Sequence, residues 1–289
     1  MTLRCTGTRP IAFVLIRILM LCAINSPASA AERVQFDSAR YQVGPLQRRL
    51  ALERHESILP QPVETVDGYL TKPEGPGPFA ALVHLHGCGG LPPTVKRSAD
   101  HFWAERLAAW GYVVLVVDSF TSRHIGNTCS GEYAPRVADA YGALAWLTRQ
   151  PFVDPQRVGV IGFSAGGIAA LSLAESRDFE LFEEEVAHRF KAAVAYYPAC
   201  VTDGNVKIPT LVMIGELDDW SPAARCSGMM KRRKPEIPVR LIVYPGAHHV
   251  FDAPGPGRRY FGHWLEYNAA AAEHASEEVR QFLARHLSR

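Results

Sequence analysis

Short stretches that are apolar at nearly every position recur along this chain. They occupy residues 79–84, 112–117, 157–163, 192–197, 210–214 and 239–244, and an earlier candidate strand lies at 63–70. A strand that is covered by helices on both faces of a sheet has no polar face, so these runs predict buried strands of a parallel sheet. Residues 32–61 are polar, and we expect irregular structure there.

The segments between the predicted strands show helical periodicity. Apolar residues recur at i, i+4 and i+7 in two of them, and an apolar stripe runs through the C-terminal segment. These positions are Trp103, Leu107 and Trp110; Val137, Tyr141 and Leu144; and Ala275, Val279, Phe282, Leu283 and Leu287. The alternation predicts an α/β fold in which helices flank both faces of a mostly parallel central sheet. No internal repeat or Pro/Gly/Ser-rich linker divides residues 31–289, which we assign to a single domain.

The first thirty residues have the three-part pattern of a secretory signal peptide. A polar start with two arginines precedes an apolar stretch at 11–24, and small residues at Ala28 and Ala30 mark the cleavage site. The apolar stretch is shorter than the roughly 20 residues of a spanning helix and contains Arg17. We therefore expect cleavage after Ala30, export to the periplasm or secretion, and no stable membrane anchor.

The composition is that of a packed globular protein. Of 289 residues, 47% are hydrophobic and 21% are charged, which excludes a disordered or coiled-coil chain. Removing Arg4, Arg9 and Arg17 with the predicted signal peptide changes the formal net charge from +2 to −1. A nearly neutral body gives no electrostatic reason to expect nucleic acid as a partner. The one basic run, KRRK at 231–234, is typical of a solvated helix end.

Four cysteines remain beyond the predicted signal peptide. They are Cys88, Cys129, Cys200 and Cys226. An even number in an oxidising compartment favours at least one disulfide, and three connectivities are open. A zinc site is the alternative, but no two of these cysteines have the spacing of a Cys-x-x-Cys ligand pair.

A Gly-x-Ser-x-Gly motif follows one of the predicted strands. Residues 162–167 read GFSAGG and lead directly into an apolar helical segment. In that position the motif predicts a nucleophile elbow, a tight turn that lifts Ser164 above the sheet. The amide of Ala165 would then face the oxyanion that forms when the serine attacks a carbonyl.

Acidic residues and histidines follow Ser164 along the chain at the ends of later strands. A serine hydroxyl needs a base to take its proton, and the base needs a third group to orient it. Asp218 and Asp219 come after the predicted strand at 210–214, and His248 and His249 come after the last predicted strand, at 239–244. Sites of open α/β sheets form at these strand ends, and the order Ser, Asp, His is that of α/β-hydrolases. The strand ends alone leave the choice within each pair open.

A second oxyanion donor is expected from the loop after the strand at 79–84. Residues 84–90 read HLHGCGG, and we assign the donor to the amide of Cys88. His84 and His86 lie two apart on a strand and could instead bind a metal. No third ligand accompanies them, so we expect no metal.

These motifs resemble those of the dienelactone hydrolase family within the α/β-hydrolase superfamily. The resemblance runs from about residue 63 to the closing helix and rests on HGCGG at 86–90, DSF at 118–120, GFSAGG at 162–167, GELD at 215–218 and YPGAHHVF at 244–251. It implies that the acid is Asp218, three residues after its glycine. It implies that the base is His249, in an Ala-x-His-x-Phe setting, and that an ester or lactone is hydrolysed through an acyl-enzyme without metal or organic cofactor.

The chain departs from the family's founding members at the nucleophile. Those members use cysteine where this chain has Ser164, together with a glutamate that the HGCGG loop lacks. We therefore expect a general serine esterase acting on a small-molecule ester or lactone. Arg123, in the loop after DSF, could hold a substrate carboxylate, although a solvated loop arginine is the plainer interpretation. A peptidase or a glycan-ester (acetyl) esterase with the same triad, and a non-catalytic binding protein, are the alternatives.

Overall fold

The computed structural model describes residues 31–41, 44–57, 62–92, 99–175, 182, 189–234 and 236–288. The predicted signal peptide, residues 1–30, lies outside the described residues, so its cleavage stays a prediction. Across the described ranges, no helix is both long enough and apolar enough to cross a bilayer.

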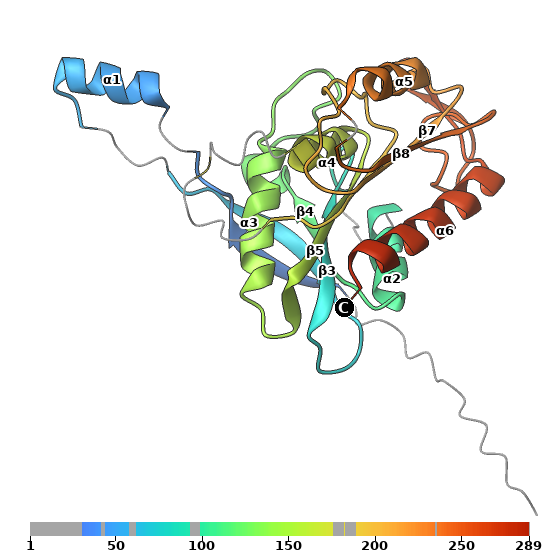
Figure 1. The fold of residues 1–289 in the computed structure, drawn as a ribbon, viewed down its shortest axis with the longest axis horizontal. Helices are drawn as coiled ribbons and strands as arrows, with labels where there is room; N and C mark the ends of the chain where they lie inside the picture. The colour runs from blue at the N-terminus through green and yellow to red at the C-terminus, as the bar shows by residue number, and fades with distance from the viewer. Residues whose placement is uncertain are drawn as a thin grey trace, which may run out of the picture.

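Most of the strands belong to one eight-stranded sheet. They are β1 (Glu32–Asp37), β2 (Thr65–Thr71), β3 (Phe79–Leu85), β4 (Val113–Asp118), β5 (Val153–Phe163), β6 (Ala193–Tyr196), β7 (Thr210–Gly215) and β8 (Val239–Tyr244). Their order across the sheet is β1-β2-β4-β3-β5-β6-β7-β8 (Figure 1). The pairs β1–β2 and β2–β4 are antiparallel, and every pair from β4 through β8 is parallel. The prediction of a mostly parallel central sheet is confirmed.

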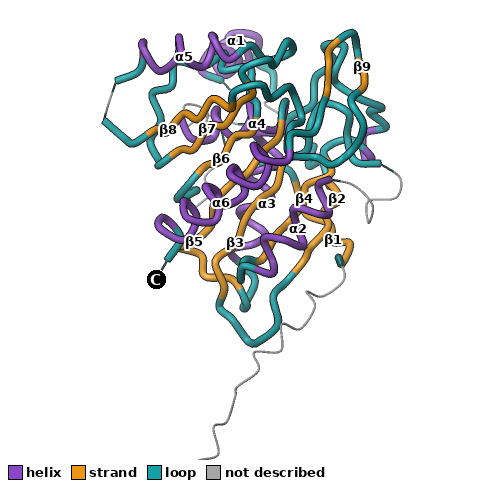
Figure 2. The backbone as a smooth tube through the Cα atoms, turned by 90° about the vertical axis from the view of Figure 1, so that its right-hand side faces the viewer, coloured by secondary structure: helices purple, strands orange, loops and turns teal. Residues whose placement is uncertain are grey.

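Helices cover both faces of this sheet. The described residues form the helices α1 (Pro45–Arg54), α2 (Ala99–Ala109), α3 (Arg136–Thr148), α4 (Ala165–Glu175), α5 (Ala223–Arg232) and α6 (Ala269–His286), with a short 3-10 helix, η2 (Thr121–Arg123), and all of the α-helices except α1 lie against the sheet. α3 and α4 lie together on one side of β3 and β5, and α2 and α6 lie on the other side (Figures 1 and 2). Arg106 of α2 donates a hydrogen bond to Ser276 of α6, which joins these two helices. α5 ends at Arg232, so the basic run at 231–234 is at a helix end, as predicted.

The burial of the strands explains why the apolar runs identified them. All six residues of β4 and all six of β7 are buried, because helices remove both faces of each strand from water. β5 begins at Val153, four residues before the predicted start, because its first residues pair with β3 near Phe79.

The expectation of irregular structure is wrong for residues 32–37 and 45–54, and residues 42–43 and 58–61 of that stretch lie outside the described residues. β1 adds an antiparallel edge strand whose only buried residue is Phe36, and α1 stands apart from the sheet (Figure 1). An edge strand with one face in water carries few apolar residues, and a helix that buries no stripe shows no apolar period. A second element that the apolar pattern did not indicate is the hairpin of β9 (Arg258–Tyr260) and β10 (His263–Leu265).

Two disulfides join the four cysteines. Cys88 pairs with Cys129, and Cys200 pairs with Cys226. The first links the loop after β3 to the loop before α3, and the second links the segment after β6 to α5. The expectation of at least one disulfide is confirmed, and the structure selects one of the three connectivities.

Candidate active site

Ser164 occupies the sharp turn between β5 and α4. Its backbone has φ of +53°, a left-handed conformation that costs free energy for any residue other than glycine. A Cβ on Gly162 would collide with the carbonyl oxygen of Gly166, and a Cβ on Gly166 would collide with the carbonyl oxygen of Leu85. The turn is therefore tight enough to require glycine on both sides of the serine, as the predicted elbow demands.

The structure brings Ser164, His249 and Asp218 into one chain of hydrogen bonds. The Oγ of Ser164 lies 3.0 Å from Nε2 of His249, and Nδ1 of the same ring lies 2.7 Å from Oδ2 of Asp218. The other oxygen of Asp218 accepts hydrogen bonds from the main-chain amides of Trp220 and Ser221 at 3.0 and 2.7 Å. His249 and Asp218 are both buried, so the carboxylate is fixed and can hold the proton of the imidazole on Nδ1.

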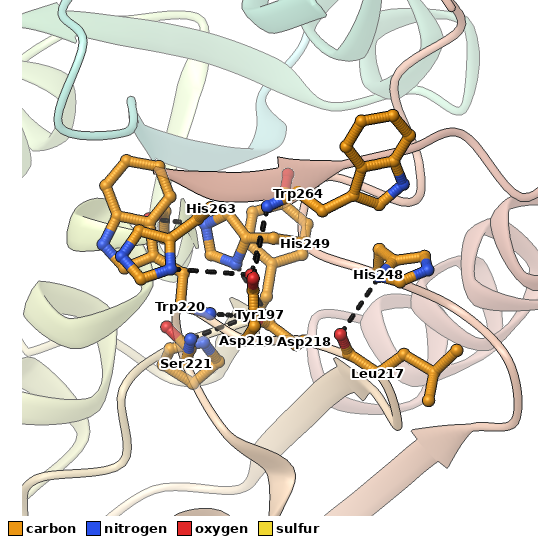
Figure 3. A network of polar contacts seen from close by, with 12 residues as sticks. Tyr197, Leu217, Asp218, Asp219, Trp220, Ser221, His248, His249, His263 and Trp264 are labelled. Carbon is orange, nitrogen blue, oxygen red and sulfur yellow. Dashed lines mark hydrogen bonds and ion pairs between the residues drawn. The ribbon is translucent and has the colours of Figure 1, made fainter. Parts of the chain in front are cut away.

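The neighbouring residues His248 and Asp219 point elsewhere. His248 Nδ1 lies 3.1 Å from the carbonyl oxygen of Leu217, and Asp219 accepts a hydrogen bond from the amide of Trp264 (Figure 3). Of the two candidate pairs, Asp218 and His249 meet at Ser164, and this is the choice that the family resemblance implies.

Aromatic rings hold the imidazole of His249 in place. Its ring centre lies 4.7 Å from that of Tyr197 and 5.2 Å from that of Trp220. The hydroxyl of Tyr197 donates a 2.8 Å hydrogen bond to the buried carboxylate of Asp252, which also accepts one from Trp103. Burial raises the pKa of Asp252, and these two hydrogen bonds oppose the shift. Asp252 thus anchors Tyr197, which packs against the imidazole.

The loop after β3 lies directly beside Ser164. A Cβ on Gly87 would sit 3.8 Å from the Cβ of Ser164. The N–H of Cys88 has no acceptor among the residues that the structure describes. Ala165 is the first residue of α4, where main-chain N–H groups have no partner within the helix. The amides of Cys88 and Ala165 are therefore two main-chain donors near the serine.

A cavity of about 250 Å³ is bounded by Ser164, His249 and the loop at 87–90. Aromatic side chains form much of its wall: Trp103, Phe163, Tyr197, Trp220 and Tyr260. Three charged residues, Asp100, Asp252 and Arg258, also line it. The predicted site residues did not include Tyr260 or Arg258, because the hairpin that carries them was not predicted.

Arg123 lies outside this cavity. Its guanidinium forms a two-pronged ion pair with the buried Asp139 at 2.8 and 2.9 Å and a third contact with Glu64 at 2.6 Å. These carboxylates raise its pKa against the opposing effect of burial. The structure therefore places Arg123 away from the cavity at Ser164, with two protein carboxylates as partners.

His84, in β3, and His86, in the loop after it, both have protein partners. His84 Nε2 lies 2.9 Å from Oδ1 of Asp100, and His86 Nδ1 lies 2.7 Å from the carbonyl oxygen of Gly87. Burial, and next the charge of Arg136, lower the pKa of His86 to about 4. Within the described ranges, no three His, Cys, Asp or Glu side chains are grouped so that they could hold a metal ion.

The comparison with known families agrees with this arrangement. The sequence model of the dienelactone hydrolase family matches residues 66–287, which covers all of the motifs above. The chain belongs to this family. A dienelactone hydrolase from Anabaena variabilis covers 90% of the chain and all of its own length, with a TM-score of 0.57 at 20% identity. An esterase from Pyrococcus furiosus covers 89% of the chain and 93% of its own length, with a TM-score of 0.59 at 18% identity. These likenesses confirm the α/β-hydrolase fold.

Curated relatives match over part of their length. A Mycobacterium tuberculosis protein that carries the name of a phosphoribosyl transferase is 31% identical over 198 residues, which are 66% of this chain and 40% of that protein. Lipase 1 of Moraxella sp. is 29% identical over 184 residues, which are 62% of this chain and 51% of the lipase. The chain thus spans about half, or less, of the length of these relatives.

Proposed function

We propose that this member of the dienelactone hydrolase family is a serine hydrolase that cleaves carboxylic esters or lactones of small molecules. The observation that carries the proposal is the pair of contacts through His249, 3.0 Å to Ser164 and 2.7 Å to Asp218. Serine, histidine and aspartate in this order of contact form the constellation that activates a serine for acyl transfer.

Each residue of the hydrogen-bonded triad, and each of the two oxyanion donors, has a defined role in the reaction. The Oγ of Ser164 attacks the carbonyl carbon while Nε2 of His249 takes the hydroxyl proton. The electron pair of the carbonyl moves to its oxygen, and the amides of Cys88 and Ala165 donate hydrogen bonds to that oxyanion. When the intermediate collapses, the bond to the leaving oxygen breaks and His249 returns the proton to that oxygen. The acyl group then remains on Ser164.

The second half repeats these steps with water. His249 takes a proton from a water molecule, whose oxygen attacks the acyl carbon. Collapse of the second tetrahedral intermediate releases the carboxylic acid and returns the proton to Ser164. Asp218 keeps the Nδ1 proton in place throughout and stabilises the imidazolium that forms in each half. The mechanism uses no metal or organic cofactor.

The cavity supports substrates of modest size. Its volume of about 250 Å³ is slightly below the range of roughly 300–1,000 Å³ that is typical of small-molecule sites. Aromatic walls favour apolar groups, and short-chain or single-ring esters and small lactones fit such a space better than long acyl chains.

The two disulfides also support action outside a reducing compartment. We propose that the chain is exported and works in the periplasm or as a secreted enzyme, which agrees with the predicted signal peptide. N-terminal sequencing of the full-length chain expressed in a secreting host tests this step, and Ala31 is the expected first residue.

The decisive experiment maps the nucleophile. A fluorophosphonate should label the wild-type protein on Ser164 and leave Ser164→Ala unlabelled, with turnover of p-nitrophenyl acetate lost in the same variant. Folding of the variant is checked by circular dichroism. Labelling that persists in Ser164→Ala would contradict the assignment, and tight ligand binding without labelling or turnover would indicate a binding protein. A panel of acetyl, butyryl and decanoyl esters, lactones, peptides and acetylated sugars then separates an esterase from a peptidase or a glycan esterase.

A further inference from the structure

Arg136 is a buried arginine beneath the loop that follows β3. It is the first residue of α3, and only 7% of its surface is exposed. One nitrogen of its guanidinium donates to the carbonyl oxygen of His86 at 2.9 Å, and the other donates to that of Gly87 at 3.1 Å. The ring of Phe120 lies against the guanidinium, 4.6 Å from its centre. The planar group is thus held in one orientation, with both arms on the main chain of one loop.

The placement of this charge is unfavourable for the fold alone. No carboxylate of the described residues lies within ion-pair distance of Arg136, and burial lowers its pKa to about 10 against the opposing charges of Asp139 and Asp100. A cation at the N-terminus of a helix also opposes the helix dipole. A buried charge without an ionic partner is costly, and such groups are found where function requires them.

The carbonyl groups that Arg136 contacts determine where amides of the loop point. A peptide unit is planar and trans, so its C=O and N–H point in opposite directions. The carbonyl of Gly87 and the N–H of Cys88 belong to the same unit. A donor fixed on the carbonyl therefore directs the N–H to the opposite side, and Cys88 lines the cavity next to Ser164.

Further contacts secure this peptide unit and the residue that follows it. Nδ1 of His86, which must carry a proton to do so, donates to the carbonyl oxygen of Gly87 at 2.7 Å. The amide of Thr128 donates to the carbonyl oxygen of Cys88 at 2.8 Å, and the disulfide fastens Cys88 to Cys129. Among these partners, Arg136 is the one that brings a full positive charge to the carbonyl of Gly87.

We propose that Arg136 is a positioning residue that aims and polarises the Gly87–Cys88 peptide unit, so that the Cys88 N–H stabilises the oxyanion. The inference rests on the proposed function and adds a second layer to it. A positive charge on the carbonyl draws electron density through the peptide and strengthens its N–H as a donor. Because the oxyanion exists only in the tetrahedral states, this contribution acts on kcat and leaves substrate binding unchanged.

The test compares two variants of Arg136 with a matched control in the full-length protein. Arg136→Gln removes the charge, and Arg136→Lys keeps it but replaces the two-pronged group with a single ammonium. The control is Arg157→Gln, because Arg157 also donates to main-chain carbonyls, those of Pro78 and Leu287, but lies in the middle of β5 and outside the cavity at Ser164. Arg157 also pairs with Asp154. The readouts are kcat and KM for p-nitrophenyl acetate, affinity for a trifluoromethyl ketone that forms a tetrahedral adduct with serine, and the melting temperature.

We expect kcat to fall about 10- to 100-fold in Arg136→Gln and by a smaller factor in Arg136→Lys, with KM within about twofold of wild type. The affinity for the trifluoromethyl ketone should fall by the same factor as kcat/KM. Arg157→Gln should lower the melting temperature without changing kcat or that affinity.

Three results would overturn the proposal: unchanged kcat in folded Arg136→Gln, a loss carried by KM with unchanged ketone affinity, or failure of both Arg136 variants to fold where Arg157→Gln folds. The last result assigns Arg136 to the fold alone. Failure of the proposed function is distinguishable, because the wild-type protein itself would then neither hydrolyse the ester nor react at Ser164.

Discussion

The two histidines that follow β8 have different surroundings. His249 is buried between Asp218 and Ser164, whereas His248 is partly exposed and turns toward the carbonyl of Leu217 (Figure 3). A general base must reach the proton it takes, and only His249 does so.

Substitution of each histidine therefore has a different expected result. His249→Ala should lower kcat for a p-nitrophenyl ester by about 10³-fold or more, because the serine loses its base. His248→Ala should leave kcat within about threefold of wild type. Equal losses in the two variants, measured on folded protein, would contradict the assignment of the base.

His86 gives the fold a defined sensitivity to acid. Burial, and then the charge of Arg136, lower its pKa from 6.5 to about 4, and its Nε2 is buried without a hydrogen-bond partner among the described residues. Between these pH values the unfolded chain binds a proton that the folded chain does not bind. The free energy of unfolding therefore falls as the pH drops from 6.5 toward 4. Above pH 6.5 His86 causes no such dependence on pH.

The size of this loss can be measured with His86→Asn, which does not titrate and retains an N–H donor for the carbonyl of Gly87. Urea unfolding at pH 7.5 and pH 4.5 should show that wild type loses about 2–3 kcal/mol more than the variant, at about 1.4 kcal/mol for each pH unit. If both proteins lose the same stability, His86 is not the group that titrates.

At the scale of single elements, the elbow between β5 and α4 has no spare room. The N-terminus of α4 approaches β3 so closely that a Cβ on Gly166 would meet the carbonyl oxygens of Leu85 and His86. Both of those atoms belong to the main chain, which cannot move aside without disturbing the sheet.

Gly166→Ala should therefore destabilise the protein by about 1–3 kcal/mol or more and lower kcat as Ser164 shifts. Gly126→Ala is the matched control, because nothing lies within 4 Å of a Cβ at that position. Chemical unfolding and ester turnover of both variants check the expectation. A Gly166→Ala protein as stable and active as the control would show that the elbow is looser than its geometry indicates.

The elements that the sequence predicted are those whose signal is local. The strands from β3 to β8 read as apolar runs because both of their faces are buried, apart from the polar first residues of β5 and the partly exposed β8 at the parallel end of the sheet. The hairpin of β9 and β10 has no such signal. Its turn residues Phe261 and Gly262 both have positive φ, and a phenylalanine is not a residue that predicts such a turn. β1 is held mainly by its pairing with β2, and a local sequence pattern carries no information about such pairing between distant residues.

At the scale of the whole molecule, the two disulfides join segments that are distant along the chain. Cys200 and Cys226 are separated by 26 residues, and the bond between them lowers the conformational entropy of the unfolded chain. The double variant Cys200→Ala/Cys226→Ala should lose about 3 kcal/mol of unfolding free energy, with kcat for a p-nitrophenyl ester within about threefold of wild type. Chemical unfolding under non-reducing conditions measures the difference, and an unchanged unfolding midpoint would contradict it.

The assembly of the candidate site was predictable only as far as the order of strand ends allowed. Ser164, Asp218 and His249 each follow a parallel strand, so the topology of the sheet brings them to one edge. Asp252 and Arg136 were not predicted, because their significance depends on contacts with Tyr197 and with the Gly87 carbonyl. Such contacts exist only after the chain has folded, and the spacing of residues in the sequence does not predict them.

The disulfide between Cys88 and Cys129 links the activity of the protein to the redox state of its compartment. It fixes Cys88, whose amide is the proposed oxyanion donor, and it forms only when two thiols are oxidised. In a reducing compartment, a newly synthesised molecule would have Ser164 in place but an unconstrained oxyanion loop. It would therefore hydrolyse esters of the producing cell only slowly. Export to an oxidising compartment would then complete the proposed oxyanion site by forming this bond.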